Sequence, residues 1–511
     1  MNRRDFLEFS TTTALAALCT RPGLSQSSEV QHGFPASELK SFSYVETDPI
    51  AEYRHALTSA YEAFQDMKFG VRIHWGIYSI WHRGAESWPF LKMSFADRQK
   101  YNNLYKTWNP RGFDADVWMD TFRDSGMKMF AFTTKHHEGF SMFDTRTRVK
   151  SRADWTAIGG PKLESCDLAY SIMETPFRRD IVRELCDAAH KRNIKIDLYF
   201  SHPDWYDADF RPYVVHPLQV PSSSKLQSAP DFSWTQRMYG DNQVIVSDPT
   251  DAEVSHMIER HRAQLVELLT NYGRIDMICL DMWLGPRIWP ELRKTIMKMR
   301  ELQPEVMLRD RGIGNYGDYY TPERVIPGSE GASDKPWFCI YPLGTDFSYE
   351  ADAAKYKGTE WIVHNLADTV AKGGGLMVGV GPSAQGEFHP EAVRQMKDAG
   401  KWLKVNGEAI YATRPREGTG WAEGDTVRYT RSKHRRFVYA ILTKWPGTQV
   451  TLNSVQPKPG STVTLLGSDV LLPWRFDSDR GTTVTFPENL QEPHSRPCQY
   501  AWSLKMEVAR A

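Results

Sequence analysis

The stretch from Met127 to His137 reads MKMFAFTTKHH, an apolar run that ends in one lysine and two histidines. An apolar run of this length that enters a polar turn is typical of a buried β-strand. The same arrangement recurs along the chain, at residues 71–75, 194–200, 277–281, 306–310 and 376–380. Polar side chains close most of these predicted strands: His74, Lys135 to His137, Ser201 and His202, Asp281, and Arg309 to Arg311.

Helical segments separate the predicted strands. Apolar residues at spacings of three and four occur in residues 178–192, 254–272 and 289–302. Strands that alternate with helices predict an α/β architecture with a parallel sheet, and six recognisable strands favour a (β/α)8 (TIM) barrel. In that fold the chemistry lies at the carboxyl ends of the strands, where the polar residues fall. A doubly wound sheet is less favoured, because no Gly-rich phosphate loop follows the first strand.

The pattern changes from about residue 412. Short β-rich runs separated by Gly, Pro, Ser and Asp turns follow, at residues 427–430, 437–442, 449–452, 463–466 and 482–486. They predict an antiparallel β-sandwich that packs against the barrel or carries a secondary sugar contact. We therefore expect a linker over residues 26–46, a catalytic barrel over 47–411 and a β-sandwich over 412–511.

The first 25 residues are interpreted as an export signal. Arg3 to Leu7 resembles the twin-arginine motif, and residues 10–18 supply an apolar stretch that is too short to span a bilayer. We expect a bacterial protein that is periplasmic or secreted. Two alternatives stay open. One is an ordinary N-terminal helix, and the other is lipid anchoring at Cys19, which the large Leu18 before it disfavours.

Composition excludes several classes of protein. A chain of 511 residues has room for two or three domains and a large core. Its 63 basic side chains balance 63 acidic ones, so no nucleic-acid or anionic-membrane partner is expected. The six cysteines show no paired spacing typical of a zinc site. Aromatic residues make up 12% of the chain, a surplus compatible with sugar stacking. The oligomeric state stays open, and a homo-oligomer is compatible with the sequence.

His136 and His137 follow a predicted strand directly. Adjacent residues on an extended segment point to opposite sides, so at most one would face the barrel axis unless the strand has ended. Adjacent histidines chelate a metal awkwardly and no further cluster supplies ligands, so we expect no metal and no cofactor. Two hydrogen-bonded histidines at a strand end are one alternative, and binding of a polyhydroxylated ligand is the other.

Asp281 ends an apolar strand. A carboxylate there is costly unless it is solvated, paired or used, so Asp281 is a candidate nucleophile or base. Its alternative role is to cap the helix around Pro290. Glycoside hydrolysis with retention needs a second carboxyl roughly 5 to 5.5 Å away. Sequence spacing does not rank the candidates, which are Asp310, Asp318, Glu323 and Glu330.

Four stretches resemble the α-L-fucosidases of glycoside hydrolase family 29: residues 69–79, 109–118, 133–143 and 402–411. The block Lys135-His-His-Glu-Gly-Phe140 is highly specific to that family. The resemblance implies a (β/α)8-like barrel followed by a β-sandwich, and double displacement without a metal. It also implies that Asp281 is the nucleophile, that Arg311 corresponds to the arginine of an Asn-Asp-Arg motif, and that Trp75 or Trp283 covers the C5 methyl. The implied fucose-binding residues are His74, His136, His137 and Tyr199.

The resemblance is weaker for the acid/base. Some members carry it in a Trp-Glu motif, where this chain has Trp337-Phe338. Others place it about a dozen residues after the Asn-Asp-Arg motif, which implies Glu323, with Glu330 in reserve. Glu86 and Trp88 stand near the position of a sugar-contacting Glu-Trp-Tyr sequence and are expected to bind substrate. Cys279 stands where some members have a tryptophan, which leaves L-galactose-like substrates open.

The sequence thus predicts an exported, retaining α-L-fucosidase that acts on fucosylated glycans. Asp281 would stay ionised and attack the anomeric carbon, and Glu323, its pKa raised in the free enzyme, would protonate the leaving oxygen. Two alternatives remain: a non-catalytic fucose-binding protein on a hydrolase scaffold, and a hydrolase of a related sugar such as an α-L-galactoside.

Overall fold

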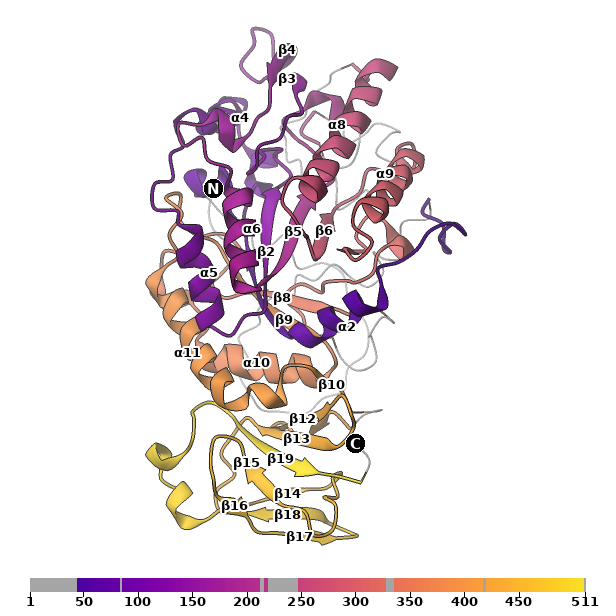
Figure 1. The fold of residues 1–511 in the computed structure, drawn as a ribbon. Helices are drawn as coiled ribbons and strands as arrows, with labels where there is room; N and C mark the ends of the chain where they lie inside the picture. Colours follow the sequence, from indigo (N-terminus) through magenta and orange to yellow (C-terminus); the bar gives the residue numbers. More distant parts are fainter. Residues whose placement is uncertain are drawn as a thin grey trace, which may run out of the picture.

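Seven parallel strands form the sheet at the centre of the larger domain (Figure 1). The computed structural model describes residues 44–82, 85–211, 216–218, 247–327, 335–416 and 420–509. Along the sheet the strands run in the order β7, β6, β5, β2, β1, β9, β8. In chain order they are β1 (Phe69–Ile73), β2 (Met129–Lys135), β5 (Lys195–Ser201), β6 (Met277–Asp281), β7 (Met307–Leu308), β8 (Phe338–Pro342) and β9 (Gly375–Val380).

An irregular eighth segment closes this sheet into a barrel. Residues 319–323 lie between β7 and β8 and make parallel bridges to both, at Arg309, Trp337 and Ile340. The Ile340 N–H donates to the Pro322 carbonyl at 2.9 Å. Pro322 has no N–H of its own, which interrupts the regular ladder. The predicted TIM-like barrel is confirmed, and Glu323 stands at the carboxyl end of its irregular eighth segment.

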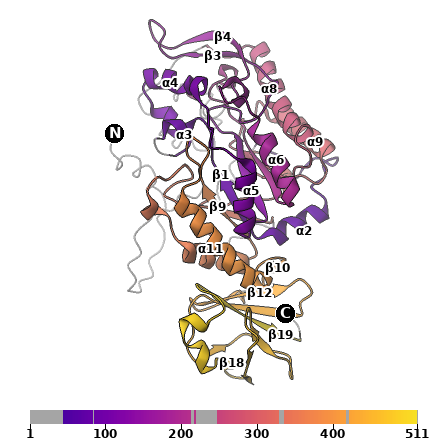
Figure 2. The same ribbon diagram turned by 60° about the vertical axis from the view of Figure 1, so that its left-hand side comes forward.

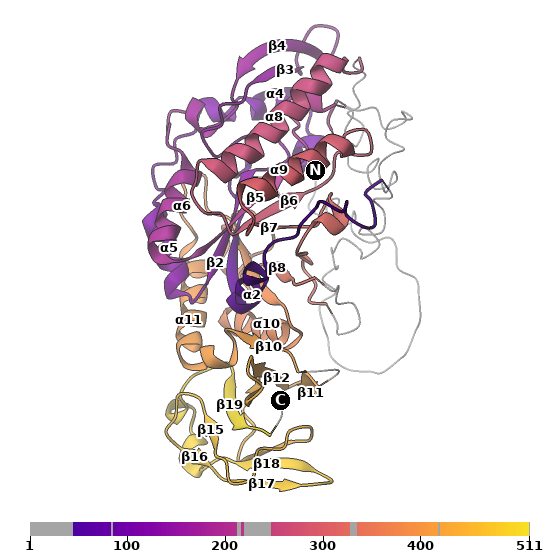
Figure 3. The same cartoon turned by 45° about the vertical axis from the view of Figure 1, so that its right-hand side comes forward.

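Helices cover the outside of the barrel (Figure 3). Aspartate and threonine side chains cap several of them, as at Asp114, Asp180 and Thr250. The outer helices are α5 (Ala115–Asp124), α6 (Ile181–Arg192), α8 (Asp251–Thr270), α9 (Trp289–Leu302), α10 (Thr359–Ala371) and α11 (Pro390–Asn406). Among the described residues no helix is both long and apolar enough to cross a membrane.

The two ends of the barrel are closed differently. At the amino ends of the strands, α2 (Thr58–Met67) places Phe64 and Met67 in one apolar cluster with strand methionines such as Met129 and Met307. Beyond the carboxyl ends lie the short helices α3 (Tyr78–Trp81) and α4 (Phe95–Asn102) and the hairpin of β3 (Val149–Asp154) and β4 (Lys162–Leu168) (Figure 2). The polar residues predicted to bind a ligand therefore lie at the carboxyl end of the barrel.

The smaller domain is an antiparallel β-sandwich, as predicted (Figure 2). One sheet has the order β10, β12, β13, β19, β15, β16 with β11 beside β12, and the other has the order β14, β18, β17. The strands are β10 (Thr413–Arg414), β11 (Ala422–Glu423), β12 (Val427–Ser432), β13 (Phe437–Leu442), β14 (Gln449–Leu452), β15 (Val463–Leu465), β16 (Leu471–Leu472), β17 (Trp474–Asp477), β18 (Gly481–Thr485) and β19 (Trp502–Glu507).

The predicted export signal, residues 1–25, lies outside the described residues, as do most of the predicted linker and Glu330. The structure therefore describes the barrel, the sandwich and the other predicted site residues.

Candidate active site

Asp281 is the last residue of β6 and lies at the centre of the polar cluster at the carboxyl end of the barrel. Tyr199 of β5 donates its hydroxyl to Asp281 Oδ2 at 2.6 Å, and Arg311 Nη1 donates to Oδ1 at 2.7 Å. His137 Nε2 lies 4.0 Å from Oδ2. The next residue, Met282, has a φ of 64°, which turns the chain away immediately after the carboxylate. Asp281 is thus held by two hydrogen-bond donors, one from β5 and one from the loop after β7, with His137 close by.

Glu323 is the second carboxylate of the cluster, and it shares its partners with Asp281. Arg311 Nη2 lies 2.9 Å from Glu323 Oε1, so one guanidinium bridges both carboxylates. Arg309 Nη2 donates to the same Oε1 at 2.9 Å, and Arg309 Nη1 lies 3.6 Å from Asp281 Oδ1. The structure therefore brings together the two carboxyl groups proposed for the catalytic pair.

The two adjacent histidines both belong to this cluster. The register between β2 and β5 shifts near Thr133, and β2 ends at Lys135, so the strict alternation of an extended strand no longer applies. The rings of His136 and His137 lie 4.1 Å apart. His136 Nδ1 makes a 2.6 Å hydrogen bond with Ser87 Oγ, and His137 Nδ1 bonds with Ser201 Oγ. The prediction that at most one of the two histidines faces the barrel axis assumed that the strand continues. Here β2 ends at Lys135, so the prediction does not apply.

His74 and Tyr199 complete one side of the cluster. Their ring centroids are 6.2 Å apart, and the Tyr199 ring stacks on His136 at 5.6 Å. Burial lowers the pKa of His74 and of His137 well below the usual value, so both imidazoles are neutral. Among the described residues His74 Nδ1 has no hydrogen-bond partner. A neutral imidazole offers one donor and one acceptor, which suits a sugar hydroxyl.

Trp75 does not join the site, contrary to expectation. It follows His74 on an extended segment and therefore points to the opposite side. Its ring packs 5.3 Å from Trp118 of α5 and 5.4 Å from Phe113, and its Nε1 donates to the Ser383 carbonyl. Trp75 is an element of the barrel-to-helix core, so it cannot cover a sugar methyl.

Two other predicted tryptophans lie nearer to the carboxylates. Trp88 opens the short 3-10 helix η3 (Trp88–Lys92) and sits edge-on to His137, with ring centroids 4.6 Å apart, and 5.6 Å from Trp205. Trp283 is buried two residues after Asp281. Trp88 thus contacts a residue of the polar cluster directly.

Glu86 is a buried carboxyl with an unusual backbone. Its φ is 30°, and its N–H donates to Ser348 Oγ at 2.8 Å. Among the described residues its Oε1 has no partner. Burial, with the nearby Asp346 as the next cause, raises the pKa of Glu86 well above its usual value. The raised pKa favours the protonated form of Glu86, which can donate a hydrogen bond.

The pKa of Glu323 differs from the prediction. Burial alone would raise it, but Arg311 and Arg309 outweigh burial, so the pKa of Glu323 is lowered. The same balance of burial against Arg311 and Arg309 holds the pKa of Asp281 well below its usual value. Asp281 is ionised as expected, whereas the predicted rise for Glu323 in the free enzyme is wrong, because Arg311 and Arg309 together outweigh burial.

Sequence reasoning missed several residues of the cluster. Arg309 was visible only as a polar residue closing a strand, and nothing in the pattern marked Ser87 or Ser201 as partners of the histidines. Phe347, whose ring lies 4.9 Å from that of His74, carried no motif at all. Of the other acidic candidates, Asp318 accepts from the Leu308 N–H at 2.7 Å and pairs with Arg300, a structural role.

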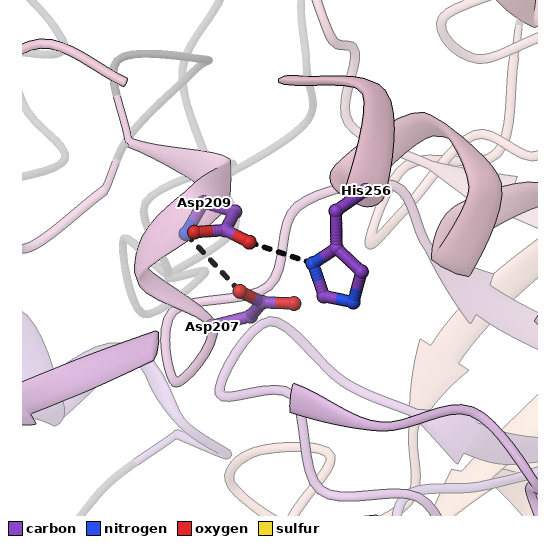
Figure 4. Close-up of side chains that lie close together, drawn as sticks. All are labelled: Asp207, Asp209 and His256. Carbon is purple, nitrogen blue, oxygen red and sulfur yellow. Dashed lines mark hydrogen bonds and ion pairs between the residues drawn. The ribbon is translucent and has the colours of Figure 1, made fainter. Parts of the chain in front are cut away.

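One group of described side chains has the spacing of metal ligands, and it lies apart from Asp281. Asp207 and Asp209 belong to the loop after β5, and His256 lies on α8 (Figure 4). His256 Nδ1 contacts Asp209 Oδ2 at 2.6 Å, and Arg260 Nη1 donates to Asp207 at 3.1 Å. Because arginine and histidine already supply the positive charge, these groups are interpreted as an ion-pair network.

The α-L-fucosidase family model matches residues 46–408, and the model of the α-L-fucosidase C-terminal domain matches residues 423–507. The chain belongs to the α-L-fucosidase family. Members of this family, glycoside hydrolase family 29, are glycosidases, and the barrel and the sandwich of this member correspond to the two matched regions.

Relatives of this family member include enzymes from animals and bacteria. It is 28% identical over 465 residues to the tissue α-L-fucosidase of Homo sapiens, covering 87% of this chain and 88% of that one. It superposes on α-L-fucosidase isoenzyme 1 from Paenibacillus thiaminolyticus with a TM-score of 0.68 and 24% identity, covering 88% and 98% of the chains. A trapped covalent intermediate of a Bacteroides thetaiotaomicron family 29 enzyme with 2-fluoro-fucosyl fluoride gives a TM-score of 0.67 at 23% identity, covering 91% and 99%.

Proposed function

We propose that this protein is a retaining α-L-fucosidase that removes terminal α-L-fucosyl residues from glycans. The observation that carries the proposal is the ionised Asp281, held by Tyr199 and Arg311 beside a second carboxyl and among neutral histidines. This set supplies a nucleophile, an acid/base and hydroxyl-binding groups at the open end of the barrel.

In the first step one carboxylate oxygen of Asp281 attacks the anomeric carbon of the bound fucoside. The bond from that carbon to the glycosidic oxygen breaks, and the oxygen takes a proton from Glu323. The hydrogen bonds from Tyr199 and Arg311 keep Asp281 in one orientation before attack. The product is a covalent fucosyl-enzyme with the inverted configuration.

In the second step Glu323, now a carboxylate, takes a proton from water. The water oxygen attacks the anomeric carbon and releases Asp281, which restores the starting configuration. The charge on Arg311, which contacts both groups, favours the carboxylate of Glu323 formed in the first step and the carboxylate that Asp281 regains in the second.

Glu86 is a second candidate for the acid, because it is the buried carboxyl of this cluster whose pKa is raised. The two assignments differ in an azide experiment. If Glu323 is the acid/base, Glu323→Ala with 4-nitrophenyl α-L-fucoside is accelerated by azide and yields α-fucosyl azide, whereas Glu86→Ala is not rescued. Rescue of Glu86→Ala alone would move the role to Glu86.

The first test of the function is release of 4-nitrophenol from 4-nitrophenyl α-L-fucoside. Asp281→Ala should lower kcat by about 10³-fold or more, since the nucleophile is lost. Asp276→Asn is the matched control, because Asp276 precedes the amino end of the same strand and bonds Lys195 at 2.9 Å. Wild-type protein that binds fucose without releasing nitrophenol or cleaving fucosylated oligosaccharides would contradict the proposal. Faster turnover of the matching α-L-galactoside would show that the enzyme prefers a related sugar.

We also propose that residues 1–25 direct export, on the strength of Arg3-Arg4 and the short apolar stretch after them. Replacing both arginines with lysine should leave the protein in the cytoplasmic fraction. Unchanged fractionation of this variant would contradict the proposal.

A further inference from the structure

Arg309 is a buried cation that the proposed reaction steps do not use. It follows β7 directly and is 1% exposed. Its Nη2 donates to Glu323 Oε1 at 2.9 Å, its Nη1 lies 3.6 Å from Asp281 Oδ1, and Nη1 also donates to Cys279 Sγ at 3.3 Å. Arg309 thus hydrogen-bonds Glu323 directly and lies 3.6 Å from Asp281.

Cys279 provides the space for this arrangement. It lies on β6 two residues before Asp281, so both side chains point to the same face of the strand. The Arg309 N–H donates to the Ile278 carbonyl at 3.0 Å, which continues the pairing of β7 with β6. A side chain much larger than cysteine at position 279 would meet the guanidinium.

Arg309 also balances charge in the barrel. Three arginines, Arg72, Arg309 and Arg311, lie among three carboxylates, Asp197, Asp281 and Glu323. A buried charge without a partner is costly, so removing one arginine favours protonation of one carboxyl. Of the three carboxylates, Glu323 is the most exposed, at 20% of its side chain against 11% for Asp281, and it makes the shorter contact with Arg309.

We propose that Arg309 is a positioning residue that holds Glu323 as a carboxylate in the empty site and thereby confines turnover to acidic solution. This inference rests on the proposed function. The groups that face Glu323 are Arg309 and Arg311 after β7, Asp281 of β6, Glu86 before η3 and Cys339 of β8. Among them the two arginines favour the carboxylate, whereas Asp281 and burial favour the protonated form.

The consequence appears in the pH profile. Hydrolysis needs Asp281 ionised and Glu323 protonated, so kcat/KM falls once pH rises above the pKa of Glu323 in the free enzyme. Because Arg311 and Arg309 lower that pKa, the alkaline limb of the wild type lies at acidic pH. A substrate with a poor leaving group, such as phenyl α-L-fucoside, depends fully on the acid and shows this limb most clearly.

The test compares Arg309→Asn with Arg309→Lys. In Arg309→Asn the alkaline limb of kcat/KM should move up by about 1 to 3 pH units, the usual effect of removing an adjacent opposite charge. In Arg309→Lys the charge stays and the limb should remain near that of the wild type. Arg428→Asn, which breaks an ion pair with Asp368 far from the site, is the control and should not move the limb. A lower rate for Arg309→Asn at every pH, with an unmoved limb, would show a merely structural role and overturn the proposal.

A second readout is independent of activity. In protein labelled with 13C at the glutamate carboxyl carbon, the resonance of Glu323 is assigned by its loss in Glu323→Gln, and its titration is followed with and without Arg309→Asn. A higher midpoint in the variant supports the inference, and equal midpoints overturn it. If the wild type hydrolyses no fucoside, the proposed function fails, but this titration still decides whether Arg309 controls Glu323.

Discussion

At the scale of single residues, Gly312 fixes the distance between the two halves of the site. Its φ is +80°, and a Cβ there would lie 2.2 Å from the Met282 carbonyl oxygen. Met282 follows Asp281 and Gly312 follows Arg311, so this close backbone approach brings the carboxylate and its guanidinium together. Gly312→Ala must separate them or strain both loops.

We expect Gly312→Ala to lower kcat/KM by about 100-fold, the usual cost of displacing a catalytic group by about 1 Å. Gly424→Ala is the matched control, because Gly424 also has a positive φ of 54° but nothing lies within 4 Å of its added Cβ. Steady-state kinetics on an aryl fucoside measure both variants. Equal activities for the two would show that collision with Met282 has no role.

The two tryptophans Trp75 and Trp88 should respond in opposite ways to substitution. Trp75 is wholly buried between barrel and helices, so Trp75→Ala should destabilise the fold by about 3–5 kcal/mol and leave KM unchanged in the folded fraction. Trp88 is half-buried against His137, so Trp88→Ala should raise KM roughly tenfold, about 1.4 kcal/mol, with a smaller loss of stability. Chemical denaturation and kinetics on both variants test this, and a raised KM for Trp75→Ala would place that residue back in the site.

At the scale of elements, the strands and helices followed from the sequence wherever the apolar pattern was regular. The run from Phe437 to Leu442 was readable as a strand, and α9 begins at Trp289 and ends at Leu302 as predicted. Residues 319–323 could not be recognised as part of the barrel, because Pro322 breaks the ladder and the segment, Tyr-Tyr-Thr-Pro-Glu, contains no apolar run.

The site residues that belong to sequence motifs could be predicted from the sequence. Asp281, Glu323 and the histidine pair meet where strand ends meet, as the barrel topology requires. The direction of the pKa shift at Glu323 was not predictable, since it depends on how closely both Arg311 and Arg309 approach that carboxyl. Strand alternation alone predicts that Trp75, the neighbour of His74, points away from the site.

The ion pair of His256 and Asp209 joins α8 to the loop after β5, and it should make stability depend on pH. The contact with Asp209 raises the pKa of His256 above its unfolded value of about 6.5. A raised folded pKa means that the stabilisation is fully present below about pH 6.5 and is lost as pH rises through the folded value. His256→Gln should therefore unfold more easily than the wild type at pH 5.5, and the difference should shrink at pH 9. Thermal midpoints across this range measure it, and a difference that grew with pH would reverse the sign and contradict the assignment.

At the scale of the whole molecule, the apolar core of the barrel extends to one face of the sandwich, so the two domains share part of that core. Along β13, Val438, Ala440 and Leu442 face the interior of the sandwich, whereas Tyr439 and Ile441 belong to the core of the barrel and its helices. The continuous apolar sequence of this strand reflects burial on both faces. Polar contacts surround the interface, including Arg428 with Asp368 of α10 at 2.6 Å and Trp402 Nε1 with the Ala501 carbonyl at 2.8 Å.

This shared core predicts that the two domains unfold together. Calorimetry of the full chain should give one transition, because separating the domains would expose Tyr439, Ile441 and Ala501 and the faces of α10 and α11 that they cover. A chain ending at residue 411 should be insoluble or strongly destabilised, although every proposed catalytic residue is retained. Trp402→Ala in the full chain is the milder test, and it should lower the single transition rather than split it. Two separate transitions, or a soluble and fully active shortened chain, would show that the sandwich is an independent appendage and that the shared core does not support the site.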